Sequence, residues 1–359
     1  MTPVWIMVIV ALLAVLQTVY YNRFGLRKVS YTRRFSRERV FAGEQVELVE
    51  VLSNDKLVPV PWVRVESRIS GDLRFRRQEN MGLSMDRFHK SLFFLGPYSR
   101  ITRRHEITCL RRGWYDCSLV SMSAGDLFGV AHDRADVTGD AKLFVYPAVL
   151  RPEELPETAL KWQGDVTVKR WILPDPLLVT GIRDYRAGDP LKDVHWGATA
   201  RTGSLQVKQR DYTVSPRALL ILNCQISERQ VGGMEPADAE FLEGGVRICA
   251  SLAAWCVRSG VDVGFLTNGE SRLEGVDLRI PPRCSEAQLD RILEALAVLK
   301  IRMTLDLHVL LDREMESSPG GMDILIVSAY WSAVLEERAR KLRQMGNSVT
   351  WLKIGGGVS

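Results

Sequence analysis

The sequence lacks the short motifs that mark several common enzyme classes. None of its 359 residues forms a G-x-x-x-x-G-K-[ST] phosphate loop, an H-E-x-x-H metal helix or a G-x-S-x-G nucleophile turn. Any nucleotide chemistry in which the protein takes part is therefore expected to come from a partner. Metallohydrolases of the H-E-x-x-H type and hydrolases of the G-x-S-x-G type are disfavoured, because their usual signatures are absent.

Cysteine is sparse and unpaired in the sequence. No C-x-x-C pair and no compact disulfide framework occurs, and no nucleophile signature surrounds any cysteine. A papain- or transglutaminase-like site is therefore disfavoured. Reduced, mostly buried thiols typical of an intracellular compartment are expected instead. The cysteines are Cys109, Cys117, Cys224, Cys249, Cys256 and Cys284.

Charge is missing from the start of the chain. No charged residue lies between Pro3 and Tyr21, and a helix of that length rises about 28 Å, close to the hydrocarbon thickness of a bilayer. Trp5 at one end and Tyr20 and Tyr21 at the other are typical interfacial residues. We predict an uncleaved transmembrane helix over residues 1–22, since a signal peptide would need a basic start and a small-x-small cleavage site.

A basic juxtamembrane segment is predicted over residues 23–40. It holds seven basic residues and one acid, so the positive-inside rule places the following domains in the cytoplasm of a single-pass membrane protein. Basic residues near anionic lipid contribute about 1 kcal/mol each. The residues expected to face lipid are Arg23, Arg27, Lys28, Arg33 and Arg34.

The positive charge is concentrated near the predicted membrane helix. Residues 1–150 carry 22 basic and 15 acidic side chains, and residues 151–359 carry 26 and 28. Outside the juxtamembrane segment the chain is nearly neutral. A nucleic-acid partner is therefore not expected.

Residues 41–150 predict an all-β sandwich. Short apolar stretches with partial alternation recur between Gly, Pro and Asn-Asp turn signals such as Asn54-Asp55 and Gly96-Pro97. Such spacing is typical of short antiparallel strands.

The remaining chain divides into a connecting segment, 151–216, and an α/β domain, 217–359. After Arg217, apolar strands alternate with amphipathic helices, which predicts a mostly parallel, doubly wound sheet covered on both faces. Gly269–Ile280 interrupts the alternation, and we expect it to form a hairpin or an antiparallel edge strand.

The connecting segment holds the candidate site. Three aspartates beside one histidine could bind a cation or supply an acid and a base. Arginine and lysine occur among them in nearly equal number, which favours a structural ion-pair network. We expect a structural or interaction motif, with catalysis as the alternative. The candidate residues are Arg183, Asp184, Tyr185, Arg186, Gly188, Asp189, Asp193, His195, Trp196 and Arg201.

The chain resembles the domain-of-unknown-function 58 family. The resemblance is carried by Arg112-Gly113-Trp114-Tyr115 with Gly125-Asp126-Leu127-Phe128-Gly129, by Val145-Tyr146-Pro147, and most specifically by the segment from Arg183 to Lys208. It implies membrane helices and an immunoglobulin-like β domain joined to a von Willebrand A-like domain. Members commonly have two membrane helices, and this sequence shows one. The resemblance also implies a MoxR-type AAA ATPase as partner.

The metal-binding run of a von Willebrand A domain is degenerate here. Such domains hold Mg²⁺ with Asp-x-Ser-x-Ser, because hard cations need anionic and hydroxyl oxygens. The matching positions are Asn223, Gln225 and Ser227. Val327-Ser328-Ala329-Tyr330 likewise lacks a carboxylate after a later strand. No metal and no other cofactor is expected.

Two functions follow as hypotheses. The first is a membrane-anchored cytoplasmic scaffold or adaptor that works with a MoxR-type AAA ATPase in assembly or maturation of an envelope complex. The alternative is a hydrolase that acts on an envelope precursor through His195 and the neighbouring aspartates.

Overall fold

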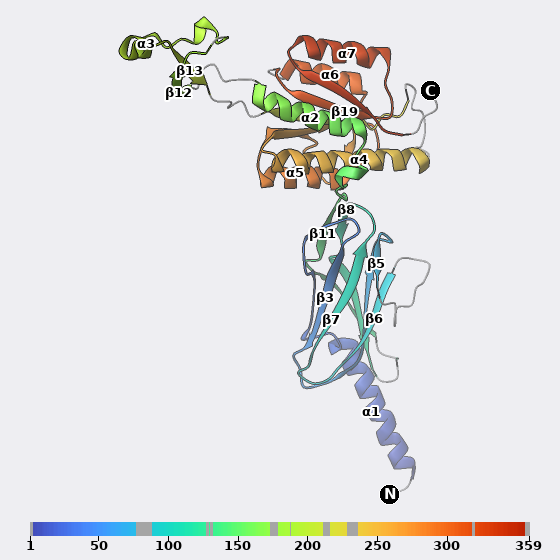
Figure 1. The fold of residues 1–359 in the computed structure, drawn as a ribbon. Coiled ribbons are helices and arrows are strands. Elements are labelled where there is room, and N and C mark those ends of the chain that lie inside the picture. The colour runs from blue at the N-terminus through green and yellow to red at the C-terminus, as the bar shows by residue number, and fades with distance from the viewer. Residues whose placement is uncertain are drawn as a thin grey trace. The chain divides into compact units, whose positions relative to one another are not determined.

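The computed structural model describes residues 3–76, 88–126, 129, 132–172, 179–186, 188–210, 216–227, 236–317 and 320–355. The chain divides into two compact units, Met1–Ala148 and Val149–Ser359. The first holds an N-terminal helix and a β-rich region, and the second holds an α/β sheet (Figure 1).

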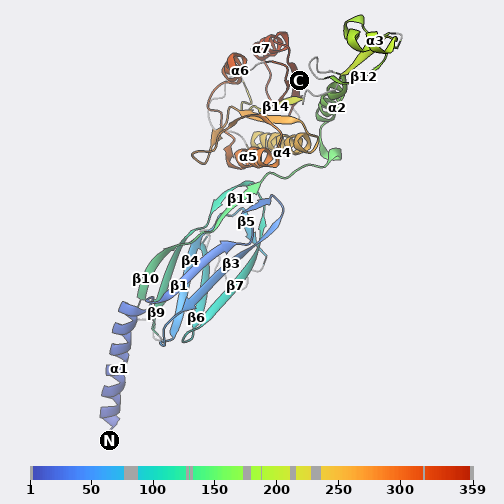
Figure 2. The ribbon, with the colours of Figure 1, turned by 90° about the vertical axis from the view of Figure 1, so that its left-hand side faces the viewer.

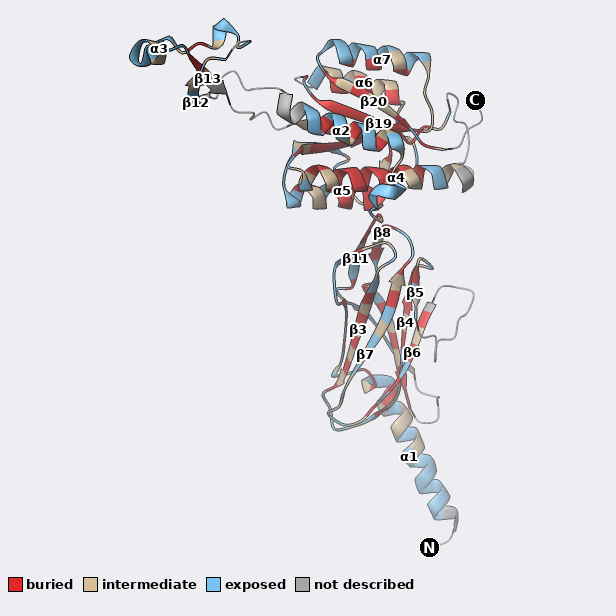
Figure 3. Ribbon diagram, viewed as in Figure 1, coloured by how far each residue is buried: buried red, intermediate tan, exposed pale blue. Residues whose placement is uncertain are grey.

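Helix α1, Pro3–Phe24, opens the first unit. Its span Trp5–Phe24 has a mean hydropathy of 1.8, long and apolar enough to cross a membrane. Its side chains are mostly exposed (Figure 3), as an apolar helix would be if lipid covered it. This is the helix predicted over residues 1–22.

Two four-stranded antiparallel sheets form the sandwich, as the alternating apolar stretches predict (Figure 2). The first has the order β1-β3-β7-β5 and the second the order β10-β9-β4-β6. The strands of the first are β1 Val29–Phe35, β3 Gln45–Asn54, β7 Arg100–Cys109 and β5 Leu73–Phe75; those of the second are β10 His132–Thr138, β9 Leu119–Gly125, β4 Val60–Arg68 and β6 Phe88–Leu95.

A smaller three-stranded sheet closes one end of the sandwich. It has the order β2-β11-β8, with β2 Arg39–Phe41, β11 Lys142–Tyr146 and β8 Gly113–Asp116. The core lies where alternate residues of the strands point inward, as in the burial of Val46, Leu48 and Leu52 along β3.

The sandwich begins earlier than the sequence indicates. Strand β1 lies inside the predicted juxtamembrane segment and pairs with β3 from Val29 opposite Asn54 to Phe35 opposite Leu48. Tyr31, Arg33 and Phe35 alternate inward along it. The β structure therefore begins before the predicted boundary at residue 41.

A five-stranded sheet forms the centre of the second unit, in the order β17-β15-β14-β19-β20. The strands are β14 Arg217–Leu222, β15 Asp262–Thr267, β17 Arg279–Arg283, β19 Asp323–Ser328 and β20 Ser348–Lys353. Four are parallel, and β17 pairs antiparallel with β15 at one edge. The interruption predicted over Gly269–Ile280 therefore does lead into an antiparallel edge strand.

Helices cover both faces of this sheet, with α4 and α5 on one side and α6 and α7 on the other (Figures 1 and 2). Each helix turns an apolar stripe inward, such as Leu335, Ala339 and Leu342 along α7. Their bounds are α4 Pro236–Arg258, α5 Glu286–Val298, α6 Leu307–Ser317 and α7 Ala333–Gln344. A two-stranded pair, β16 Glu270–Ser271 with β18 Leu299–Lys300, completes the unit.

The predicted connecting segment is not uniform. Its helix α2, Glu157–Ile172, buries Trp162, whose ring lies 6.3 Å from that of Trp255 on α4. Helix α2 therefore belongs to the packed α/β unit. Because α2 contains few apolar residues, its sequence gave little indication that it packs against the sheet unit.

The segment 179–210 forms a small module of its own secondary structure. Strands β12, Val179–Asp184, and β13, Gln206–Arg210, pair antiparallel, and helix α3, Trp196–Thr202, lies between them in sequence. A 3₁₀ turn, Leu191–Asp193, precedes α3. We call residues 179–210 the hairpin module.

Candidate functional site

The charged residues of the hairpin module partly pair, as the balance of signs indicates. Arg183 binds Asp189 with two hydrogen bonds, of 2.7 and 2.8 Å. The backbone N–H of Arg186 donates to the same carboxylate. These contacts lower the pKa of Asp189 to about 2, the Arg183 guanidinium contributing most. Gly188, at φ 108°, allows the turn that brings Asp189 back to Arg183.

The other predicted members take separate positions. The Asp184 carboxylate accepts from the amide of Gln206 on the paired strand. Asp193 lies in the 3₁₀ turn, and Arg201 lies exposed on α3. Tyr185 is half-buried, and its backbone N–H donates to Leu205. The structure thus brings together Arg183, Arg186 and Asp189, and the Asp184 carboxylate has a different partner, Gln206.

His195 has a structural position. It is the N-cap residue of α3, and its Nδ1 accepts a hydrogen bond of 3.0 Å from the backbone N–H of Ala198. N-cap side chains satisfy backbone N–H groups that lack a partner in the first helical turn. Because that nitrogen is engaged, only Nε2 is left for acid or base chemistry.

The hairpin module exposes large apolar side chains. Trp196 is 67% exposed and Leu191 is 68% exposed, while Val194 and Val207 are buried. Exposed tryptophan is the residue type that most often anchors protein interfaces. The module is therefore held by its own contacts and leaves Trp196 exposed.

A buried amide cluster lies at the carboxyl ends of the parallel strands. Asn223 follows β14, and its amide donates to Ser328 Oγ over 2.8 Å at the end of β19. Asn268, which follows β15, donates to Asn223 Oδ1 over 2.9 Å. Asn268 Oδ1 in turn accepts from the backbone N–H of Cys224. The side chains of this cluster thus satisfy one another.

The amide cluster lies where ligands bind in open α/β sheets, since β15 and β19 flank β14 on opposite sides. Gln225 belongs to it through its backbone N–H, which donates to Asn223 Oδ1, and Ser227 is exposed. The sequence reading missed Asn268, although a polar residue directly after a buried strand was a usable signal. Absence of a metal here stays a prediction.

A second buried polar cluster lies inside the sandwich, and the sequence reading missed it. Glu50 on β3 accepts from Tyr31 on β1 over 2.7 Å and from His105 on β7 over 3.0 Å. Arg33 Nε lies 3.6 Å from the carboxylate, and His89 Nε2, on β6 of the other sheet, lies 4.0 Å away. Burial alone raises the pKa of Glu50, but the two imidazoles and Arg33 outweigh it and hold the pKa well below its usual range.

The ligand atoms of Glu50, His89 and His105 lie within 4.8 Å of one another, as in a zinc site. Arg33, with a fully buried side chain, already compensates the charge of Glu50. A dication would add positive charge that the described residues do not balance. We therefore interpret the cluster as a structural link between the two sheets.

Most residues expected to face lipid are exposed, with one exception. Arg23, Arg27, Lys28 and Arg34 are exposed, and the Arg27 guanidinium lies over the ring of Phe24. The prediction for Arg33 is wrong, because this residue points into the sandwich and pairs with Glu50.

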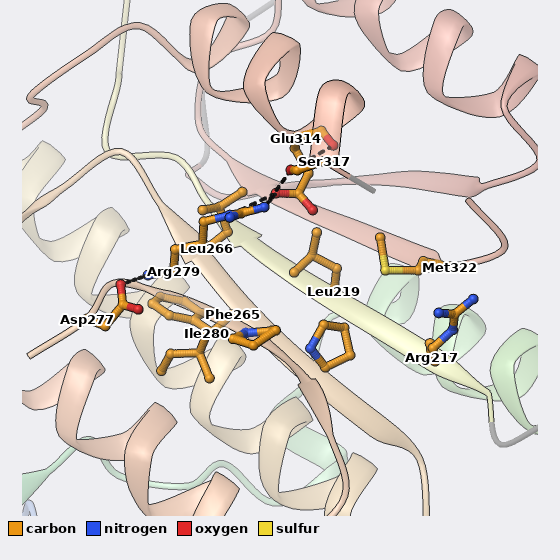
Figure 4. A pocket seen from close by; sticks show the side chains of 12 residues that line it. Arg217, Leu219, Phe265, Leu266, Asp277, Arg279, Ile280, Glu314, Ser317 and Met322 are labelled. Atoms are coloured by element: carbon orange, nitrogen blue, oxygen red, sulfur yellow. Dashed lines mark hydrogen bonds and ion pairs between the residues drawn. The ribbon is translucent and has the colours of Figure 1, made fainter. Parts of the chain in front are cut away.

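A pocket of about 430 Å³ lies in the α/β unit beside the edge strand β17. Figure 4 shows Arg279 bridging to Glu314 and Ser317 along one wall, above Leu219 and Phe265. None of the residues predicted for a site lines the pocket. Its apolar floor and charged wall were not detectable in sequence, because they come from four separate elements.

The fold defines a protein with a membrane-type N-terminal helix, a β sandwich and an α/β unit. Residues 181–353 match the family described as "Protein of unknown function DUF58". The match covers the hairpin module and the α/β sheet, and it supports the resemblance drawn from Arg183 to Lys208. Of the motifs behind that resemblance, Leu127 and Phe128 lie outside the described residues.

One relative aligns with most of the chain at low sequence identity. The chain is 19% identical over 254 residues to the "Uncharacterized protein YeaD" of Bacillus subtilis (strain 168), across 69% of this chain. The chain spans 58% of that relative's length.

The sandwich region also aligns with solved β-rich domains. The CARDB domain of the PF1109 protein from Pyrococcus furiosus aligns at 15% identity and TM-score 0.19, over 32% of this chain and 94% of that one. A non-cellulosomal cohesin from Archaeoglobus fulgidus aligns at 8% identity and TM-score 0.22, over 33% and 91%. Both scores are low, and the two-sheet arrangement rests on the strand order above.

Proposed function

We propose that this chain is a membrane-anchored scaffold or adaptor that works with a MoxR-type AAA ATPase in assembly or maturation of an envelope complex. In this proposal α1 anchors the chain as a single pass, the sandwich is immunoglobulin-like, and the α/β unit is von Willebrand A-like. Both units lie in the cytoplasm, and the ATPase supplies the nucleotide hydrolysis for which the sequence has no phosphate loop.

The exposed Trp196 carries the proposal. A small module that is held by its own Arg183–Asp189 pair and N-cap, yet leaves Trp196 67% exposed, has the features of a docking element. The amide cluster favours a scaffold over a metal-dependent enzyme. Its polar atoms are paired at the position where a von Willebrand A domain would hold Mg²⁺, so it offers no open ligand set.

The hydrolase alternative has weaker support. The Asp184 carboxylate accepts from Gln206, the Asp189 carboxylate pairs with Arg183, and the His195 Nδ1 caps α3. An acid–base mechanism needs such groups within hydrogen-bond reach of one reacting atom.

The test is recovery of a AAA ATPase with the full chain from detergent extracts, with and without ATP. The proposal expects recovery from the native chain and reduced recovery from a variant with Arg183, Asp189 and Arg201 replaced by Ala. A matched control replaces the exposed pair Glu157 and Lys161 on α2. Equal recovery from all three chains would remove the hairpin module from the interface.

A further inference from the structure

One end of the sandwich gathers three chain segments around the base of α1. They are residues 25–28, which follow the helix, 55–59, which join β3 to β4, and 96–99, which join β6 to β7. We call these segments the α1 end of the sandwich. The strand register places them together, because Val29 pairs with Asn54 and Val60 with Leu95.

Hydrogen bonds fix the α1 end to the helix. Lys56 Nζ donates to the carbonyls of Phe24 and Gly25 over 2.8 and 2.7 Å, which caps the helix C-terminus with a cation. Tyr21 donates to the carbonyl of Pro59 over 2.8 Å. The loops and the helix base are therefore held at a fixed level relative to each other.

The two loops are also tied to one another. The buried Asn54 amide donates to the carbonyls of Val58 and Gly96, and the Tyr98 N–H donates to Lys56 O. Leu57 and Tyr98 nevertheless remain 71% and 70% exposed. Tyr98 has φ 45°, a left-handed conformation that costs about 1 kcal/mol for a non-glycine residue. The loop is thus fixed by hydrogen bonds and strained at Tyr98, and it keeps an aromatic side chain exposed. We take this combination to indicate that the loop contacts something outside the first unit.

The length of α1 indicates that the bilayer surface is what this loop contacts. Near its C-terminal end α1 contacts the sandwich, where the hydroxyl of Thr18 donates to Asp126 over 3.0 Å. The apolar span of α1, Trp5–Phe24, has 20 residues and rises about 30 Å, the thickness of a bilayer core. This span ends at Phe24, whose carbonyl accepts a hydrogen bond from Lys56. The bilayer surface then falls at the α1 end.

We propose that the α1 end of the sandwich is a second membrane contact. Leu57 and Tyr98 enter the headgroup region, and the exposed Arg27 and Lys28 lie beside anionic headgroups. The inference rests on the proposed membrane anchoring by α1 and adds that the sandwich lies on the bilayer surface rather than apart from it.

The test measures the depth of Leu57 in the full chain in vesicles that contain anionic lipid. Cys284, the exposed cysteine, is replaced by Ser, and an environment-sensitive fluorophore is attached at Leu57→Cys. The control is Leu119→Cys, which is 75% exposed and begins β9, about 20 Å along that strand from Gly125 at the α1 end. Nitroxide lipids should quench the label at 57 at least threefold more than the label at 119.

Equal weak quenching at both positions in chains that float with the vesicles would overturn the second contact while leaving the anchor intact. Chains that do not float would instead refute the anchor, and with it this inference. Tyr98→Gly checks the role of the loop: it relieves the positive φ, so thermal stability should hold or rise, while quenching at 57 should fall. Unchanged quenching would exclude Tyr98 from the contact.

Discussion

The buried cluster around Glu50 and the half-buried surface pair of Asp189 and Arg183 use the same chemistry in different roles. Both pair a carboxylate with an arginine, and both lower the carboxylate pKa. Glu50 is 1% exposed and joins strands from both sheets, whereas Asp189 closes a surface turn within six residues of Arg183. In this chain, a segment that is dense in charged residues forms a local turn. The cluster that links the two sheets is formed instead by charged residues that lie far apart in the sequence.

The largest expected effect is from Glu50→Gln. It leaves Arg33 buried beside a neutral partner, and breaking a buried ion pair costs about 3–5 kcal/mol. The matched control is Glu47→Gln on the same strand, whose partner Arg104 is exposed. Chemical unfolding of the full chain in detergent measures both free energies of unfolding. Similar values for the two variants would refute the structural role of the Glu50 cluster.

Acid should act through the same carboxylate. A carboxyl group with a folded-state pKa below its unfolded value stabilises the fold above the unfolded value, and that contribution is lost as pH falls. For Glu50 the loss should begin below the ordinary value of 4.5. In the Glu50→Gln chain the slope of stability against pH below 4.5 should be shallower than in the native chain. Parallel slopes would assign acid sensitivity to other groups.

A smaller effect is expected from changes at His195. His195→Ala removes the cap of α3 and should cost about 1 kcal/mol, whereas His195→Asn keeps a good capping residue and should cost less. Thermal unfolding distinguishes the two. The hydrolase hypothesis expects both variants to lose any turnover, so a folded His195→Asn chain that has lost a measured activity would favour the enzyme.

The smallest effect on stability is expected from the Arg183–Asp189 pair. Its two side chains are half-buried at the surface of the module, so Asp189→Asn should lower the melting temperature far less than Glu50→Gln and weaken mainly the recovery of an ATPase. Exchanging the two residues, Arg183→Asp with Asp189→Arg, should restore the pair and part of the recovery. A large drop in melting temperature for Asp189→Asn would show that this pair stabilises the fold as the Glu50 cluster does.

Much of the architecture could be predicted from sequence, because periodicity reports burial directly. The strands and helices after Arg217 and the alternating strands before Val145 follow from apolar spacing alone. The start of the sandwich was predicted too late, at residue 41, since basic residues such as the inward-facing Arg33 favoured a juxtamembrane segment. Helix α2 was similarly missed, although it buries Trp162.

The candidate site was less predictable, because apolar periodicity does not report which polar side chains meet. Contacts within the hairpin module are local, so pairing by Arg183 could be inferred from charge balance, although not its choice of Asp189. The Glu50 cluster draws His89 and His105 from strands far apart in the chain, and the amide cluster draws Asn268 from beyond a helix. Such residues meet only through the pairing of strands that are distant in sequence, and this pairing cannot be derived from apolar periodicity.

Photo-crosslinking from position 196 in intact membranes tests the central claim most directly. A photoreactive phenylalanine derivative replaces Trp196 in one chain and the exposed Val168 of α2 in another. The account predicts an adduct with a AAA ATPase from position 196 that depends on ATP, and none from position 168. Absence of that adduct from position 196, in a chain that is folded and held in the membrane, would contradict the scaffold proposal.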